Sequence, residues 1–498
     1  MSDLYGKNRI TGVLLLFFAA IYILLPCRFS STDAWYYAAC IKYNTELFHP
    51  FHLIYNLFGK IICFIPENFG IDTLACLKAM NASFAVMSLY VVMLILQYVK
   101  KKKSEIILIT ALCGASFSVM RYATENETYI VPLFFGLVSS YFFITYILSA
   151  RKQAIFLSFF FASLSVLLHL SYLFWLLSIL AGTFMIKKDY KILFQGLIIS
   201  LIIPVAYILA VYVTQGSLNY DAIKEFAGGR SFKGMFSVSL SGLLLSVISL
   251  ARSFIQVHGY MINMLKESWF NFIPALLSIC FFISAMLHLK DLKWHIENRT
   301  FVFTHVLIAV LMLIFAVVSE GNAEFMVMIP VLVFIITGII VDEGKKFYTM
   351  LLTGMLIWNL FYGLIPLNRI SGESEKYLCN MLVENNDIAV IARDDQQIAS
   401  MVFYYTGKES SHNIYKSPAV LKIRGKDPEI LKGVIDSLLV QDKKVFTDCL
   451  SIMPMSRAVF LEGKINQQFF STYILKEEKR WENTGGIRII HRITGKKS

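Results

Sequence analysis

The chain has 498 residues, of which 57% are hydrophobic, 14% aromatic and only 16% charged, with a net charge of +12 and a mean hydropathy of +0.62. Soluble globular proteins carry about 25% charged residues, so this chain has too little polar surface to form a water-soluble globule. The same composition excludes a disordered chain, a coiled coil and a collagen-like rod. A protein that crosses a membrane several times is the class that remains.

A membrane helix needs roughly 20 mostly apolar residues. Eleven segments satisfy this requirement, and in chain order they are 10–27, 72–98, 105–120, 129–149, 153–169, 171–186, 191–213, 269–289, 301–318, 324–341 and 347–366. A twelfth apolar run at 237–257 contains Arg252 and several Ser residues, which weaken it as a span. We therefore predict an all-α polytopic membrane bundle of about 11 transmembrane helices.

Lys and Arg set the orientation of such a bundle, because they are retained on the cytoplasmic side. With Lys7 and Arg9 inside, the alternate short loops hold 16 basic residues, counted from the N-terminus to Lys346. The short outer loops hold one, Arg121. We therefore predict a cytoplasmic N-terminus and an extracytoplasmic C-terminus, with 214–268 as an external insertion in which 237–257 lies on or dips into the membrane.

The composition changes near residue 370, where 370–498 holds 19 Lys and Arg and 16 Asp and Glu, a soluble balance. Strands are predicted at 388–392, 445–447 and 487–490, and helices at 395–406 and at 427–440, the latter capped by Asp427 with Pro428 at its first position. The sequence thus predicts two domains, a transmembrane domain at 1–369 and a small soluble extracytoplasmic α/β domain at 370–498. Asp394 and Asp395 follow a strand, where a helix cap is the preferred interpretation and a ligand carboxylate the alternative.

The eight cysteines are scattered without a CxxC motif, so the sequence encodes no metal cage. Cys379 and Cys449 share the tail domain. They would pair in an oxidising compartment or remain two buried thiols, and both interpretations stay open.

Acidic, histidine and aromatic residues gather in the outer loops. Asp33 and Tyr36 follow the first span, and His49 and His52, three residues apart, come soon after. The other outer polar positions are Arg121, Glu125, Glu127, His169, Glu320 and Glu324. The other side of the membrane carries plain Lys and Arg, so this concentration on one face indicates a functional site.

This arrangement resembles the GT-C superfamily of integral membrane glycosyltransferases, and within it the relatives of protein O-mannosyltransferases and aminoarabinose transferases. The resemblance depends on Asp33 after span one, on His49-Pro50 and on the second acidic loop at Glu125 and Glu127. It implies roughly 8–13 spans, a cytoplasmic N-terminus, a polyprenyl-phosphate sugar as donor and often an extracytoplasmic C-terminal domain. Many members carry two adjacent acids in the first loop, whereas Ala34 follows Asp33 here, so Glu125 or Glu127 would supply the second carboxylate.

The chemistry that this resemblance implies is inverting sugar transfer to an acceptor hydroxyl on a protein, lipid or glycan. Asp33 is the expected base, and Glu125 is expected to stabilise the cation-like transition state. The residues expected to bind the substrate are Tyr36, His49, His52, Arg121, Glu127, His169, Arg230 and Arg252. No cofactor is required, although a divalent cation that bridges a carboxylate and the phosphate is compatible with the loops.

Two competing functions are an O-antigen polymerase or ligase and a transporter of lipid-linked saccharides. Polymerases and ligases rely on Arg-rich outer loops, whereas these loops are acidic. Transporters place polar residues or breaks in the middle of spans, which are almost free of charge here. We expect a protein of the bacterial inner membrane with its tail domain in the periplasm.

Overall fold

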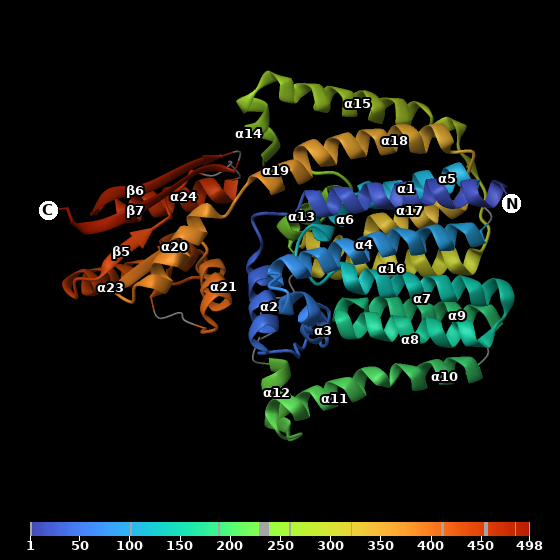
Figure 1. The fold of residues 1–498 in the computed structure, drawn as a ribbon, viewed down its shortest axis with the longest axis horizontal. Helices are drawn as coiled ribbons and strands as arrows, with labels where there is room; N and C mark the ends of the chain where they lie inside the picture. The colour runs from blue at the N-terminus through green and yellow to red at the C-terminus, as the bar shows by residue number, and fades with distance from the viewer. Residues whose placement is uncertain are drawn as a thin grey trace. The chain divides into compact units, whose positions relative to one another are not determined.

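The computed structural model describes residues 2–99, 102–187, 190–228, 239–257, 260–319, 321–409, 413–452, 457–483 and 485–497. The chain divides into two compact units (Figure 1). The first comprises Met1–Pro26, Glu46–Val257 and Ile273–Leu364, and the second comprises Cys27–Thr45, His258–Phe272 and Ile365–Ser498. The segment that carries Asp33 therefore groups with the C-terminal part of the chain.

The first unit is a bundle of helices. In chain order they are α1 (Ser2–Leu24), α3 (Tyr55–Asn68), α4 (Thr73–Tyr98), α5 (Lys103–Ala115), α6 (Phe117–Ala123), α7 (Ile130–Ser149), α8 (Lys152–Leu168), η1 (Leu170–Tyr172), α9 (Leu173–Lys187), α10 (Tyr190–Ser200), α11 (Ile202–Gln215), α12 (Tyr220–Gly228), α13 (Leu240–Phe254), α15 (Phe272–Leu287), η3 (Leu289–Asp291), α16 (Arg299–Val318), η4 (Ala323–Met326), α17 (Ile329–Ile340), α18 (Lys345–Trp358) and the π-helix η5 (Asn359–Leu364). Two short strands, β1 (Lys293–Trp294) and β2 (Val341–Asp342), pair antiparallel.

Seven helices of the described residues are long and apolar enough to cross a membrane, or up to eight if α5 and α6, bent by 63° at their break, are counted as one span. The seven are Thr73–Tyr98, Ile130–Ser149, Tyr190–Gln215, Trp269–Asp291, Arg299–Val318, Ala323–Ile340 and Lys345–Glu384. A multi-span membrane protein is thus confirmed, but the predicted number of about 11 spans is not reached by this criterion. The remaining predicted spans form apolar helices of 10–17 residues at Ile10–Leu24, Lys152–Leu168 and Leu170–Ile186, so the count of eleven stays a prediction.

Several hydrogen-bonding groups inside the bundle bind one another. Ser139 and Ser158, on the neighbouring helices α7 and α8, each donate a hydroxyl to the other's carbonyl, at 2.8 and 2.9 Å. The Trp175 indole donates to Ser140 Oγ at 3.1 Å, and the buried His305 Nε2 lies 2.8 Å from the same oxygen. Such pairing is what a low-dielectric interior requires, because an unpaired polar group there costs several kcal/mol.

The twelfth apolar run forms α13, whose described apolar part, Gly242–Phe254, is shorter than a span. Ser239 caps its first turn by accepting from Gly242 N at 2.9 Å. The Ser249 hydroxyl donates to the Gly321 carbonyl at 2.6 Å, which fastens α13 to the loop that precedes η4. α13 is therefore bound by a hydrogen bond to another segment of the first unit.

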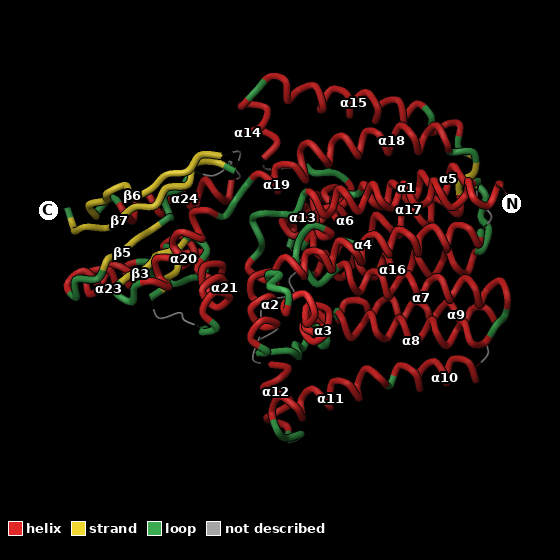
Figure 2. The backbone as a smooth tube through the Cα atoms, viewed as in Figure 1, coloured by secondary structure: helices red, strands yellow, loops and turns green. Residues whose placement is uncertain are grey.

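The second unit contains a mixed sheet, drawn in yellow in Figure 2. Its elements are α2 (Thr32–Tyr43), α14 (Tyr260–Glu267), η2 (Trp269–Asn271), α19 (Ile365–Arg369), α20 (Glu373–Glu384), β3 (Ile388–Ala392), α21 (Asp395–Thr406), β4 (Ile414–Lys416), α22 (Pro418–Ile423), α23 (Glu429–Val440), β5 (Lys444–Thr447), α24 (Arg457–Phe470), β6 (Tyr473–Asn483) and β7 (Gly486–Lys496). The strand order is β4-β3-β5-β7-β6, with β4, β3 and β5 parallel and β7 and β6 antiparallel.

The alternation of side chains along β3 builds two apolar layers. Ile388, Val390 and Ala392 pack with residues of α20 and α21. Ala389 and Ile391 face the other way and pack with residues of α23 and α24. Both faces of the strand are covered, which explains why its sequence is continuously apolar rather than alternating.

The predicted strand 388–392 and helix 395–406 have the bounds of β3 and α21. The second predicted helix begins at Glu429, with Pro428 as its cap residue, so the predicted cap at Asp427 is wrong by one position. Asp427 Oδ1 still accepts from Glu429 N at 3.0 Å. Asp394 caps α21 by accepting from Gln397 N at 3.0 Å, so the preferred interpretation of that residue is confirmed. Cys379 and Cys449 are two buried free thiols, which decides between the open alternatives.

The packing of α13 against Gly321 generates a prediction. Gly321 and Gly216 both have a positive φ, of +75° and +68°, so alanine at either position strains the backbone by about 1 kcal/mol. A Cβ on Gly321 would lie 2.6 Å from the backbone nitrogen of Ser246 in α13, whereas one on Gly216 meets nothing within 4 Å. We expect Gly321→Ala to destabilise the protein by about 1–3 kcal/mol more than Gly216→Ala. Thermal unfolding in detergent measures the difference, and equal shifts would contradict this account of the packing.

Candidate functional site

Three histidines that the sequence singled out lie together in the first unit. The rings of His49 and His52 stack with centroids 4.0 Å apart, and the ring of His169 lies 6.0 Å from that of His52. All three are at most 6% exposed. Residues 120 positions apart along the chain therefore form one histidine cluster.

Backbone hydrogen bonds explain how the histidine cluster forms. Ile54 N donates to the Leu167 carbonyl at 3.1 Å, and Leu170 N donates to the Phe51 carbonyl at 2.8 Å, which joins the loop before α3 to the α8–α9 turn. His169 has an extended conformation, with φ −159°, and ends α8. The His169 side chain therefore lies beyond the last turn of α8, next to the loop that carries His49 and His52.

Two of the three histidines in the cluster have an Nδ1 whose role is defined by a backbone donor. His49 Nδ1 accepts from Phe51 N and His169 Nδ1 accepts from Ser171 N, both at 3.3 Å. An accepting Nδ1 leaves the proton of a neutral imidazole on Nε2. Both rings are therefore set up to donate through Nε2, which is the chemistry that an anionic oxygen requires.

The second acidic loop is clamped by groups from two other elements. Asn81 of α4 donates to the carbonyls of Glu125 and Glu127 at 2.7 and 2.8 Å. The Tyr55 hydroxyl, at the start of α3, lies 3.2 Å from both Asn126 Oδ1 and the Glu127 carbonyl. Glu125 and Glu127 are each 4% exposed, so this loop is a buried part of the unit rather than a solvated turn.

Glu125 has a charged partner that the sequence analysis missed. Lys78 Nζ lies 3.5 Å from Glu125 Oε1, with side-chain exposures of 14% and 5%. Glu125 Oε1 also accepts from Asn126 N at 2.9 Å. The sequence does contain a sign of this pair, because Lys78 is a lone charge one turn before Asn81 in a mostly apolar helix. Charged residues within membrane spans often mark functional positions.

Arg121 and Arg252, two predicted phosphate-binding residues, line the same small pocket. Its volume is about 20 Å³, and its other lining residues are Phe117, Ser118, Tyr122, Ser253 and Ala323. Arg252 Nε lies 3.4 Å from Gln256 Oε1, and its guanidinium lies 5.8 Å from the Phe117 ring. Two arginines from helices far apart in the sequence are thus brought to one place.

Aromatic rings connect this pocket to the histidine cluster. Tyr122 of the pocket lies 5.3 Å from the Tyr129 ring, which lies 5.1 Å from the His169 ring. The Tyr129 hydroxyl donates to Glu324 Oε2 at 3.0 Å, which adds η4 to this set of contacts. The segments at 49–52, 121–129, 169–172 and 321–326 of the first unit therefore form one continuous polar and aromatic region.

Asp33 and Tyr36 belong to the second unit. Asp33 lies in the first turn of α2 and is exposed, so the protein's own packing does not supply the desolvation expected from its sequence position. Asp33 does not cap this helix, because Ser31 is the cap and accepts from Ala34 N at 3.0 Å. Tyr36 packs against Phe403 of α21, with ring centroids 5.9 Å apart.

Two of the predicted positions, Arg230 and Glu320, lie outside the described residues. Among the side chains that the structure describes, no three His, Cys, Asp or Glu residues are grouped so as to hold a metal ion. The stacked geometry of the histidine cluster accounts for this, since ligands converge on a metal whereas stacked rings lie face to face.

The architecture is that of a multi-pass helical membrane protein with a C-terminal mixed sheet. ArnT from Cupriavidus metallidurans, in a crystal structure bound to undecaprenyl phosphate, matches 98% of this chain and 98% of its own, with a TM-score of 0.52 and 10% sequence identity. The oligosaccharyltransferase of Archaeoglobus fulgidus, in complex with Zn and sulfate, matches 96% of this chain and 72% of its own, with a TM-score of 0.49 and 12% identity. No protein-family model and no curated protein sequence matches the chain. The match to ArnT confirms, at the level of the fold, the resemblance to GT-C membrane glycosyltransferases.

The Lys78–Glu125 pair generates a second prediction. Removing one partner leaves the other charge buried and uncompensated, which typically costs 3–5 kcal/mol, whereas removing both charges costs little. We expect Lys78→Met to lower the unfolding midpoint sharply and the double variant Lys78→Met/Glu125→Gln to recover most of the loss. Thermal unfolding of the two single variants and the double variant tests this. Additive losses in the double variant would show that the two charges do not depend on each other.

Proposed function

We propose that this chain is a membrane glycosyltransferase that moves a sugar from a polyprenyl-phosphate donor to an acceptor hydroxyl on the extracytoplasmic face, with inversion. The single observation that carries the proposal is the fold shared over 98% of both chains with ArnT, a protein crystallised with undecaprenyl phosphate. The buried polar region of the first unit adds independent support, since a bundle that only anchored a domain would have no use for it.

The donor phosphate is proposed to bind Arg121 and Arg252. Their guanidinium groups approach one pocket, and Arg is suited to phosphate because its planar fork donates two parallel hydrogen bonds. Because the pocket has a volume of only about 20 Å³, side chains have to move apart when a phosphate enters. His49, His52 and His169 are proposed to donate to further oxygens of the donor, with Arg230 retained from the sequence.

The transfer step is a displacement at the anomeric carbon. The acceptor hydroxyl gives its proton to Asp33, its oxygen forms the new bond to the anomeric carbon, and the bond from that carbon to the phosphate oxygen breaks. The leaving polyprenyl phosphate carries away the electron pair and is stabilised by the arginines. Glu125, which the sequence analysis expected to stabilise the positive charge on the sugar, is paired with Lys78 and is proposed instead to hold its loop in place. Glu127 is proposed to stabilise that charge.

The proposed base is tested by Asp33→Asn. Asparagine keeps the shape but cannot accept the proton, so we expect transfer to fall by about 10²–10⁴-fold while folding and donor binding are kept. Because Ser31 caps α2, the substitution leaves the helix intact. Asp72→Asn is the matched control, since Asp72 is an exposed cap of α4 and Asn caps equally well. Near-normal transfer by Asp33→Asn from an undecaprenyl-phosphate sugar would place the base elsewhere.

The proposed phosphate site is tested by Arg121→Gln, Arg252→Gln and the double variant. Each lost charge-assisted hydrogen bond is worth about 1.5–3 kcal/mol, so we expect each single variant to weaken donor binding by about tenfold or more. Competition by undecaprenyl phosphate in a transfer assay measures the affinity. The control is Arg299→Gln at the exposed start of α16. A double variant that binds undecaprenyl phosphate like the unaltered protein would overturn the assignment.

A further inference from the structure

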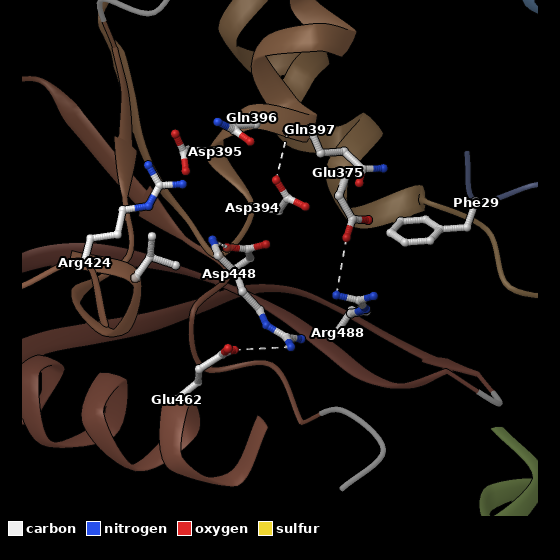
Figure 3. A pocket seen from close by; sticks show the side chains of 12 residues that line it. Phe29, Glu375, Asp394, Asp395, Gln396, Gln397, Arg424, Asp448, Glu462 and Arg488 are labelled. Atoms are coloured by element: carbon white, nitrogen blue, oxygen red, sulfur yellow. Dashed lines mark hydrogen bonds and ion pairs between the residues drawn. The ribbon is translucent and has the colours of Figure 1, made fainter. Parts of the chain in front are cut away.

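The second unit contains a pocket that the proposed transfer reaction does not use. It has a volume of about 380 Å³, within the range of sites for small molecules (Figure 3). Most of its lining side chains are charged or amide groups. The lining includes Phe29, Glu375, Asp394, Arg424, Asp448 and Arg488. We call it the strand-end pocket.

The pocket lies where parallel strands end. β3 ends at Ala392 and is followed by Asp394, and β5, its parallel neighbour, ends at Thr447 and is followed by Asp448. The residues beyond the carboxyl ends of adjacent parallel strands come to one edge of a sheet, and open α/β sheets bind ligands at this edge. Arg488 reaches the pocket from β7, and Phe29 reaches it from the segment that precedes α2.

Most charges of the strand-end pocket are paired within the protein. Glu375 binds Arg488 at 3.3 Å, and Asp395 binds Lys416 at 2.9 Å. The remaining acids that matter are Asp394 and Asp448. Each uses Oδ1 for a backbone N–H, from Gln397 at 3.0 Å and from Arg393 at 2.7 Å, and neither accepts a second hydrogen bond from a residue that the structure describes.

Asp448 is the most informative of these groups. Its side chain lines the pocket although the residue is 97% buried, being 3% exposed. Burial raises the pKa of Asp448 to about 6, with nearby Glu375 raising it further and Arg488 and Arg393 lowering it. Burying a carboxylate that accepts only one hydrogen bond from a neutral donor is destabilising. A ligand that donates further hydrogen bonds to the carboxylate would offset this cost.

The geometry points to a sugar ring as the ligand of the strand-end pocket, and we propose that its hydroxyls donate to Asp394 and Asp448 while its apolar face packs on Phe29. A metal ion is disfavoured because no three acidic or histidine side chains among the described residues are grouped to bind one. An anionic ligand is disfavoured because the lining holds five acidic side chains against three arginines. The exposed Arg424 guanidinium, which forms no ion pair with a described residue, is available to a ring or hydroxyl oxygen. The site is separate from the proposed transfer chemistry and would exist without it.

Binding is tested on the purified full chain in lipid nanodiscs. The probes are D-glucose, D-glucosamine and N-acetyl-D-glucosamine, titrated up to about 10 mM by saturation-transfer NMR, with free lysine as an amine that has no hydroxyl array. We expect saturable binding of at least one sugar and none of lysine. Asp394→Asn and Asp448→Asn should each weaken binding about tenfold or more, because both lose a charge-assisted acceptor. Asp427→Asn, an exposed acid at the start of α23, is the matched control and should bind like the unaltered protein.

Thermal unfolding separates a ligand-binding role from a structural role. Since the folded protein raises the pKa of Asp448, the charge opposes folding at pH 7.5, and protonation relieves it as the pH falls. We expect Asp448→Asn to raise the unfolding midpoint at pH 7.5, with the difference shrinking towards pH 5, while sugar binding is lost. A lowered midpoint, saturable binding of lysine, no binding of any of the three sugars, or variants that bind like the unaltered protein would each overturn the proposal. Loss of transfer in Asp33→Asn with sugar binding kept would leave it standing, so the two proposals fail separately.

Discussion

A lipid bilayer offers no hydrogen bonds, and this absence determines where the chain can place its polar groups. Within the bundle, Ser139 and Ser158 bind each other, and Trp175 and His305 share the hydroxyl of Ser140. These contacts satisfy polar groups that would otherwise lie unpaired between the spans, where an unpaired group is costly. The buried polar groups of the loops are concentrated instead in the histidine cluster, in the clamped loop at 124–129 and around two arginines. Because these buried polar groups lie mainly near the loops, the candidate functional site is sought there and not in the middle of the spans.

The elements that could be predicted from the sequence are those whose signal is local. Apolar length marked the helices of the bundle, and the five apolar residues at 388–392 marked the central strand with its bounds. The number of spans depends on where a helix bends or stops. His169 ends α8 through its extended backbone, and α5 is separated from α6 by a 63° bend, both of which arise from contacts that no window of sequence contains. The strand β6 was missed because its charged, exposed residues carry no burial pattern, and its place is fixed by pairing with β7.

The candidate site shows the same division. Residue type and sidedness were enough to select His49, His52 and His169, but only the hydrogen bonds from Ile54 to Leu167 and from Leu170 to Phe51 bring them together. Lys78 and Asn81 were overlooked because they lie inside a segment judged by its average hydropathy. The average hides the two residues that hold the acidic loop. Asp33 differs in another way, since its exposure in α2 is a property of the second unit, to which its sequence position next to the first span gives no guide.

Asp394 illustrates why a structural and a functional interpretation of one residue do not exclude each other. The sequence favoured a helix cap over a ligand carboxylate as if one had to be chosen. A carboxylate has two oxygens, and capping α21 occupies only Oδ1, through Gln397 N. Asp448 has the same division, with Oδ1 bound to Arg393 N and the side chain still lining the strand-end pocket. In both residues the backbone contact fixes the direction of the carboxylate, and a side chain held in this way meets a ligand without losing further rotational entropy. The structural role is thus a condition of the functional one, because it orients the acceptor that the pocket presents.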